Sequence, residues 1–424
     1  MSTIVAAAVQ ASWKRLASAG EVRQELSRYL RLAHNKGADV VVLPELMGVM
    51  LAIPLAGGLR GRLVKSSAGR SGFWGRLLGA LSGGAAEVLG GLSAVLPRLV
   101  DDHSDTLRDA YEELFGQAAR EHAVYLVGGS LYLQDDDGHV RALCGVFDRT
   151  GRLMGWQAKL HLSPAEAQLA VPGQTLNLFE TEFGRLGVLL GADVLYPELA
   201  RALAYRGAVA VACPAAVTAQ ADWRRLRLTL AARAQENQIF LAQSFLLGDN
   251  ELVPNAGHAF QGRSAVVAPV ELTPRTDGVL VEVGSPTAEA VVSAEWDFSA
   301  LRELWKTASM RPRAELRGPL FLDLLRFDYE SGATIDERLH TIEETSPHPA
   351  LPEPIPLTAE GERPAELPPA EQAPVETDEL APTSSAEAFI ADVEREADEL
   401  TGPTSSETER PEPDTHRPGA DTSS

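Results

Sequence analysis

Cysteine is scarce in this chain of 424 residues, with Cys144 and Cys213 as its only two. Two thiols in a chain of this length cannot form a disulfide framework, which excludes the small disulfide-rich class and predicts a reducing compartment. The first residues, Met-Ser-Thr-Ile-Val, lack a basic segment followed by a long apolar run. No signal peptide is therefore predicted, and the cytoplasm is the expected location.

Long hydrophobic runs and basic arrays are also missing. The apolar stretch 47–59 is too short to span a bilayer and contains Pro54. The chain holds 38 Lys and Arg against 59 Asp and Glu, which is a formal net charge of −21. Because nucleic-acid-binding proteins present basic surfaces to phosphate, no nucleic acid is predicted as a partner.

The negative charge is concentrated near the C-terminus. Residues 342–424 contain 21 Asp and Glu, 4 Arg and no Lys, a balance of −17 that leaves about −4 for the rest of the chain. Proline, serine and threonine accompany the acids, and too few apolar groups remain to offset the entropy of ordering. The sequence therefore predicts a domain at 1–330 and a disordered acidic tail at 331–424.

One stretch of this tail has a different pattern. Ser384 and Glu387 form a capping-box pair, and apolar residues follow at helical spacing as far as Leu400. The pattern predicts a short helix at 385–400. Because an isolated helix of this length is marginal in water, we expect its apolar face to dock on a protein partner or on the body of this chain.

The most informative stretch is 183–198. Residues 186–190 form an uncharged apolar run, which is typical of a buried strand, and 191–196 then break it. Pro197 and Glu198 fit the first turn of a helix that runs to Arg206, with Gly207 as its C-terminal stop. A second apolar strand follows at 208–213. Such a strand, turn and helix unit places a reactive residue at the carboxyl end of a strand.

Two earlier strands end in charged residues. The β-branched run 40–43 is followed by Pro44 and Glu45, and the strand that ends at 156 leads to Lys159, with Glu166 seven residues later. Taken alone, a Pro-Glu pair usually marks a solvated loop, and a lone lysine after a strand is usually solvated too. Their order along the chain, before the 186–190 strand, makes them candidates for one site.

Together these segments resemble the carbon-nitrogen hydrolase (nitrilase) superfamily, whose nucleophile segment reads Gly-x-x-Ile-Cys-x-Asp-x-x-Phe-Pro-Glu. Gly187, Asp193, Pro197 and Glu198 match this pattern, and Tyr196 stands in place of its phenylalanine. The resemblance extends over residues 3–302 and includes the Arg-Ala-x-Glu-Asn segment at 233–237, where Arg233 and Glu236 share a helical face and are expected to pair. The position of the nucleophilic cysteine is occupied by Gly191.

The resemblance implies a fold and a set of roles. The fold is an α/β four-layer α-β-β-α sandwich, which packs as a homodimer through its helix layers, and the family chemistry needs neither a cofactor nor a metal. Glu45 would be the general base, and Glu166 a supporting acid. Lys159 would stabilise the oxyanion together with the backbone N–H of Ala192, beside Asp193. His161 is expected to be structural.

Residues 52–100 are an insertion that the family pattern does not require. Apolar residues recur at helical spacing between 73 and 99, and basic residues precede them. A helix that serves as a lid or a subunit contact is one interpretation. Contact of 60–99 with a membrane surface is the alternative.

A glycine at the nucleophile position has no atom that can attack a carbonyl. One hypothesis is therefore a degenerate member, a pseudo-hydrolase, that binds a small amide or nitrile-like ligand or serves as a scaffold. The other is an active hydrolase of amide, nitrile or N-carbamoyl bonds that works without a cysteine. Cys213 lies at the end of the neighbouring strand, where a core cysteine is favoured over a replacement nucleophile.

Overall fold

The computed structural model describes residues 2–51, 92–135, 137–250 and 259–318, together with 325, 326 and 329. All described elements belong to one compact unit, Met1–Ser331. The acidic tail with its predicted helix 385–400 lies outside the described residues. So does most of the insertion, including the side chains of 60–99 that were considered for a membrane contact.

In the described part of the chain, two six-stranded sheets form the centre of this unit. The first sheet has the order β5–β4–β3–β2–β1–β12. Its strands are β1 (Thr3–Ser12), β2 (Val40–Val42), β3 (Tyr125–Gln134), β4 (Val140–Phe147), β5 (Leu153–Ala158) and β12 (Ala290–Asp297). The second sheet has the order β6–β7–β8–β9–β10–β11. Its strands are β6 (Leu178–Thr181), β7 (Gly184–Val188), β8 (Ala208–Ala215), β9 (Phe240–Leu247), β10 (Ala265–Val267) and β11 (Val279–Glu282).

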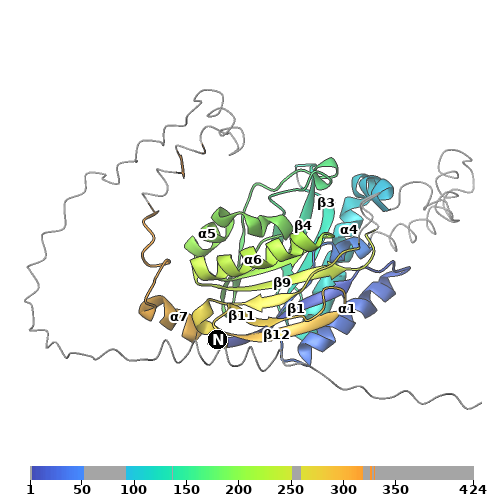
Figure 1. The fold of residues 1–424 in the computed structure, drawn as a ribbon. Coiled ribbons are helices and arrows are strands. Elements are labelled where there is room, and N and C mark those ends of the chain that lie inside the picture. The colour runs from blue at the N-terminus through green and yellow to red at the C-terminus, as the bar shows by residue number, and fades with distance from the viewer. Residues whose placement is uncertain are drawn as a thin grey trace, which may run out of the picture. The chain divides into compact units, whose positions relative to one another are not determined.

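The sheets join at one end, where Ala11 and Ser12 of β1 pair in parallel with Leu246 and Leu247 of β9. Elsewhere they pack face to face, and helices cover their outer faces (Figure 1). Helices α1 (Ala19–His34) and α4 (Leu92–His122) cover the first sheet, and α5 (Pro197–Tyr205) and α6 (Gln220–Asn237) cover the second. Helix α7 (Phe298–Thr307) follows β12. The predicted four-layer α-β-β-α sandwich is confirmed.

The alternation of side chains along β1 explains the layers. Ile4, Ala6 and Ala8 contribute to the apolar core between the sheets. The intervening residues Ala7, Val9 and Ala11 contribute to a separate core beneath α1 and α4. Successive side chains of a strand point to opposite faces, so a strand that is apolar at every position must be covered on both sides. The near-continuous apolar run of this strand is therefore a direct signal of a central layer.

Helix α4 starts at Leu92, inside the stretch 52–100 that the family pattern does not require. Val100 and Leu107 are both buried, and their spacing of seven places them on one face of a single helix. The last part of the 52–100 insertion is therefore continuous with the helix layer. No helix among the described residues is long and apolar enough to cross a membrane.

The segment after β7 follows the predicted order. Strand β7 ends at Val188, and a short 3-10 helix η3 (Gly191–Leu195) precedes α5. Pro197 is the first residue of α5, as predicted, because its missing N–H has no partner to lose at that position. Gly207 has φ +92°, the left-handed conformation in which glycine ends helices.

Candidate active site

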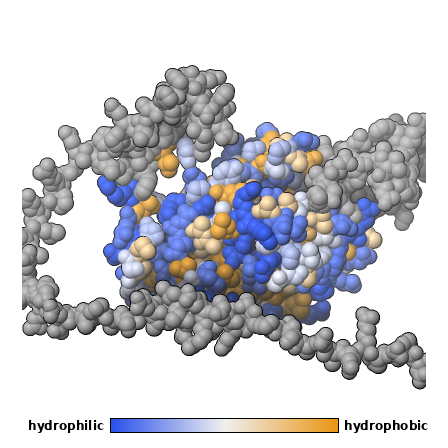
Figure 2. Space-filling model, viewed as in Figure 1, coloured by the Kyte–Doolittle hydropathy of each residue, from blue (hydrophilic) through white to orange (hydrophobic). Residues whose placement is uncertain are grey.

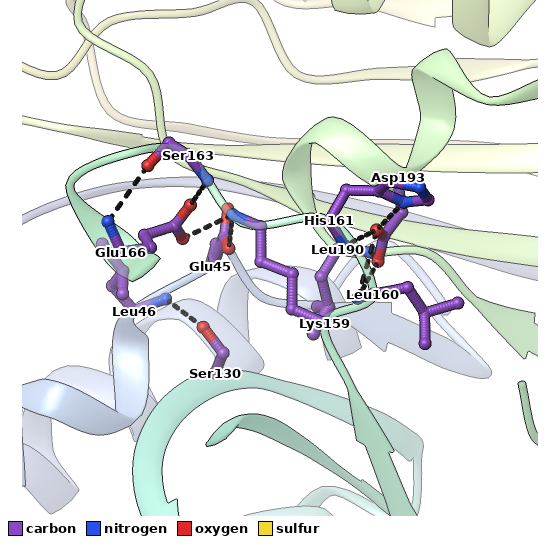
Figure 3. Close-up of polar contacts among 10 residues, drawn as sticks. All are labelled: Glu45, Leu46, Ser130, Lys159, Leu160, His161, Ser163, Glu166, Leu190 and Asp193. Atoms are coloured by element: carbon purple, nitrogen blue, oxygen red, sulfur yellow. Dashed lines mark hydrogen bonds and ion pairs between the residues drawn. The ribbon is translucent and has the colours of Figure 1, made fainter. Parts of the chain in front are cut away.

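Three loops that follow strands β2, β5 and β7 bring charged side chains together (Figure 3). The Lys159 ammonium donates hydrogen bonds to Glu45 Oε1 at 2.7 Å and to Glu166 Oε1 at 2.6 Å. The structure therefore assembles the three charged residues that the sequence nominated. We call them the Glu-Lys-Glu cluster.

Two members of the cluster, Glu45 and Lys159, are removed from solvent, and their burial affects their pKa values. Glu45 is 1% exposed and Lys159 is 5% exposed. Burial raises the pKa of Glu45 to about 7, nearby Glu166 and Asp193 add to the rise, and Lys159 opposes it. Near neutral pH, Glu45 can therefore both accept and release a proton.

The other two members of the cluster stay charged. Burial acts to lower the pKa of Lys159, but the carboxylates of Glu45 and Glu166 outweigh it and raise that pKa above its ordinary value. Burial would raise the pKa of Glu166, but Lys159 and hydrogen bonds from Ser163 hold it below its usual range. Near neutral pH, the Lys159 ammonium thus lies between Glu166, which stays ionised, and Glu45, which can gain or lose a proton.

Local turns hold both carboxylates in place. The backbone N–H of Ser163 donates to Glu166 Oε2 at 2.8 Å, and the N–H of Glu166 donates to Ser163 Oγ at 3.3 Å. After Glu45, Leu46 adopts φ +66°, and its N–H donates to the buried Ser130 Oγ at 3.0 Å. A left-handed leucine is strained by about 1 to 2 kcal/mol, so the tertiary structure must impose this conformation.

Gly191 lies directly against the cluster. It has φ +48°, and a β carbon built on it would lie 2.6 Å from Glu45 Oε2 and 3.0 Å from Lys159 Nζ. No described residue hydrogen-bonds to Glu45 Oε2, although that atom is buried. Gly191 therefore faces both the Glu45 carboxylate and the Lys159 ammonium.

The turn after Gly191 is held from both sides. Ala192 is half-buried in η3, and the buried Asp193 accepts hydrogen bonds from the loop that carries Lys159. On the other side, Arg233 donates to Val194 O at 3.1 Å and to Leu195 O at 3.0 Å. Arg233 also pairs with Glu236, as predicted. Arg233 therefore supports the turn in addition to pairing with Glu236.

Neither cysteine belongs to the cluster. Cys144 in β4 contributes to the core between the sheets, and Cys213 in β8 contributes to the core beneath α5 and α6. Burial raises the pKa of both thiols above the ordinary value, so neither is a thiolate at neutral pH. The prediction that Cys213 is a core cysteine agrees with this burial.

Tyr132, a residue of β3, is near the site but was not predicted from the sequence. Its pKa is raised above the ordinary value first by burial and then by Glu166 and Glu45, so the phenol of Tyr132 stays protonated near the cluster. In β3 it pairs with Ala142, whose carbonyl accepts the backbone N–H of Lys159 at 2.9 Å. Strand register is the signal that connects Tyr132 to Lys159, and it cannot be read before the pairing is known.

One group among the described residues is compact enough to hold a metal ion: Asp135, Asp137 and His139. These residues lie in the hairpin turn between β3 and β4. Asp135 pairs with Arg141 and accepts the backbone N–H groups of Asp137 and His139 at 3.0 and 2.9 Å. Such bonds are typical of an Asp-initiated turn, which explains the arrangement without an ion.

Two packed sheets flanked by helices place the chain in the class of nitrilase-fold α/β proteins. Residues 5–306 match the carbon-nitrogen hydrolase family, and the chain belongs to that family. The chain is 28% identical to omega-amidase NIT2-A of Xenopus laevis over 222 residues, which are 50% of this chain and 75% of that protein. It is 27% identical to the probable hydrolase YhcX of Bacillus subtilis over 227 residues, which are 53% of this chain but only 44% of that protein.

A solved structure shares the fold. It is a mutant of the amidase from Nesterenkonia sp. AN1, in which the active-site cysteine carries the acetamide moiety of fluoroacetamide. The TM-score is 0.53 at 20% sequence identity, over 76% of this chain and 96% of that one. At this identity the likeness concerns the fold alone.

Proposed function

We propose that this chain is a carbon-nitrogen hydrolase family member that binds a small amide or nitrile-like ligand without forming a covalent intermediate. The observation that carries the proposal is the position of Gly191 against Glu45 and Lys159. A covalent route requires a nucleophile within reach of the base, and glycine supplies none. The burial of Cys144 and Cys213 in strand cores supports the same conclusion.

The size of the loss in turnover that is expected without a nucleophile favours a binding function over catalysis. Removing the nucleophile from an enzyme that works through a covalent intermediate costs on the order of 10⁶ in turnover. Positioning and oxyanion stabilisation alone retain roughly 10³ to 10⁴ over the reaction in water. Lys159 and the backbone N–H of Ala192 would then serve as donors to the ligand's carbonyl oxygen or nitrile nitrogen.

A second candidate function is hydrolysis without a cysteine. Glu45 Oε2 is buried without a hydrogen-bond partner among the described residues, and the pKa of Glu45 is about 7. A carboxylate in that state can take a proton from a water molecule near neutral pH. In this scheme water attacks the carbonyl directly, and Lys159 stabilises the oxyanion that forms.

Intact-protein mass spectrometry after exposure to fluoroacetamide tests the proposal. We expect no adduct on the native protein, and we expect binding of acetamide in a titration followed by NMR. Glu45→Gln should weaken that binding, whereas Glu25→Gln, a change on helix α1, should leave it unchanged. A covalent adduct on either cysteine would overturn the proposal.

Ammonia release separates the two functions. Steady turnover of acetamide with no adduct, abolished by Glu45→Gln, would establish the water-activating alternative. Turnover that survives Glu45→Gln would exclude both schemes, because the first expects binding without turnover and the second assigns the proton transfer to Glu45.

We further propose a cytoplasmic homodimer, with the 385–400 helix as a separate docking segment for a protein partner. The face in Figure 2 carries hydrophobic groups scattered among hydrophilic ones. Tyr205 of α5 and Leu228 of α6 are both more than two-thirds exposed, at 73% and 72%. Single exposed apolar side chains are normal on a monomer, so light scattering of the purified chain must decide the dimer.

A further inference from the structure

A single buried carboxylate connects the loop that carries Lys159 to the turn that carries Gly191. Asp193 is 1% exposed and lies two residues after that glycine. Its carboxylate accepts hydrogen bonds from three backbone N–H groups, those of Leu160 (3.1 Å), His161 (2.8 Å) and Leu190 (3.3 Å) (Figure 3). Two of these donors directly follow Lys159, and the third directly precedes Gly191. The backbone on both sides of the site is therefore tied to one side chain.

A second contact joins the same two segments. His161 Nδ1 lies 3.1 Å from Asp193 Oδ1, and the imidazole ring stacks on Tyr196 with ring centroids 3.4 Å apart and planes at 12°. A ring nitrogen that faces a carboxylate carries the proton, so Nδ1 is the donor. Tyr196 directly follows η3, so the histidine ring holds the Lys159 loop against the turn at a second point.

An ordinary helix cap serves as the comparison. Asp297 also accepts two backbone N–H groups, from Ser299 at 2.8 Å and Ala300 at 3.0 Å, and caps α7. Its partners are its own near neighbours in the chain. The partners of Asp193 at Leu160 and His161 lie 33 and 32 positions away. A local cap needs only its own helix, whereas Asp193 holds a distant loop in place.

The position of Lys159 depends on that loop. On its N-terminal side the Lys159 N–H is held by Ala142 O at 2.9 Å, as an extension of the β4–β5 pairing. On its C-terminal side, the next two backbone N–H groups, those of Leu160 and His161, donate to the carboxylate of Asp193. Hydrogen bonds to an ionised carboxylate are stronger than those between neutral groups, so Asp193 is well suited to fix this side.

We propose that Asp193 is a positioning residue: it clamps the Lys159 loop to the Gly191 turn and thereby holds the ammonium between Glu45 and Glu166. The proposal concerns the same site as the proposed function, and its value for ligand binding rests on that function. Its effect on Lys159 can nevertheless be measured without any ligand.

Exchange of the Lys159 ammonium protons, followed by NMR of the full chain, tests the clamp. In the unaltered protein we expect slow exchange, because the ammonium is buried between two carboxylates. Asp193→Asn keeps the shape and removes the charge, and it should accelerate this exchange by about tenfold or more, the effect of losing charge-assisted hydrogen bonds. The matched control Asp297→Asn should not change it. Unchanged exchange in a folded Asp193→Asn protein would overturn the proposal.

A second variant separates the ring from the backbone contacts. His161→Phe retains an aromatic ring for stacking on Tyr196 and keeps the backbone N–H, but it removes the Nδ1 donor. We expect it to accelerate Lys159 exchange less than Asp193→Asn does. An equal effect would refute the assignment of the clamp to the backbone bonds.

A measurement on the unaltered protein covers the case in which Asp193→Asn does not fold. The clamp predicts that the backbone amides of Leu160 and His161 exchange as slowly as that of Lys159, which is bonded to a strand. Fast exchange of both would overturn the clamp. Absence of acetamide binding together with slow exchange would refute the proposed function and leave the clamp standing.

Discussion

The carboxylate of Glu45 occupies the space beside the α carbon of Gly191, where a β carbon would lie only 2.6 Å from Oε2. A distance this short cannot be tolerated by a real side chain, so any residue larger than glycine must displace Glu45. A side chain at position 191 would therefore lie directly against the Glu45 carboxylate and the Lys159 ammonium.

Gly191→Cys should therefore create a reactive thiol and lower the stability of the folded chain. The left-handed φ of +48° is unfavourable for cysteine by about 1 to 2 kcal/mol, and Glu45 must shift. A thiol beside the Lys159 ammonium should have a lowered pKa and be alkylated selectively near neutral pH. We expect a fluoroacetamide adduct and slow ammonia release from a small amide.

Gly191→Ala is the matched control for this variant, because it introduces the β carbon without the sulfur. It should show the same loss of stability in urea and no adduct. A folded Gly191→Cys protein whose thiol titrates like free cysteine would show that the Glu-Lys-Glu cluster is not a preserved catalytic arrangement.

The raised pKa of Glu45 predicts a pH dependence of stability. Its ordinary value of 4.5 rises to about 7 in the folded chain, so between these values the folded state holds a proton that the unfolded state has lost. Stability must therefore fall as the pH rises through this window, by about 3 kcal/mol for this group. Urea unfolding at several pH values should show this fall relative to Glu45→Gln. If the difference in unfolding free energy between the native protein and Glu45→Gln did not vary with pH, the raised pKa of Glu45 would be excluded.

The cluster should also make Lys159 important for the stability of the folded chain. Lys159→Met leaves the buried Glu45 and the partly buried Glu166 without their counter-charge, which costs on the order of 3 to 5 kcal/mol near neutral pH. The cost should shrink at acid pH, where Glu45 and Glu166 can both be protonated. Lys306→Met is the control, because Lys306 is 74% exposed and lies 3.9 Å from Glu303. Equal urea midpoints for the two variants would contradict the expectation.

Both native thiols should be inert. Cys144 and Cys213 are buried in β4 and β8, so a soluble thiol reagent can reach them only after the chain opens. We expect labelling at least about 10³-fold slower in buffer than in denaturant, with two thiols counted after unfolding. Rapid modification of one thiol in the folded protein would reopen the question of a replacement nucleophile.

Much of this molecule follows from local sequence signals. The apolar run before Gly191, Pro197 at a helix start and Gly207 at its end are short-range features, and the structure confirms each of them. Glu45 and Lys159 could be nominated because each follows a strand, and the glycine at position 191 could be read directly from the sequence. These signals need no knowledge of distant partners, because backbone conformation responds to near neighbours.

The tertiary structure alone decided how these segments meet. Glu45 and Lys159 are 114 positions apart, and their contact depends on the order in which strands β2 to β5 pair within the first sheet. In that arrangement, burial raises the pKa of Glu45. The same arrangement connects Asp193 to the Lys159 loop and brings Tyr132 near the cluster. Sheet order, register and desolvation are set by the whole chain at once, so local sequence patterns do not contain them.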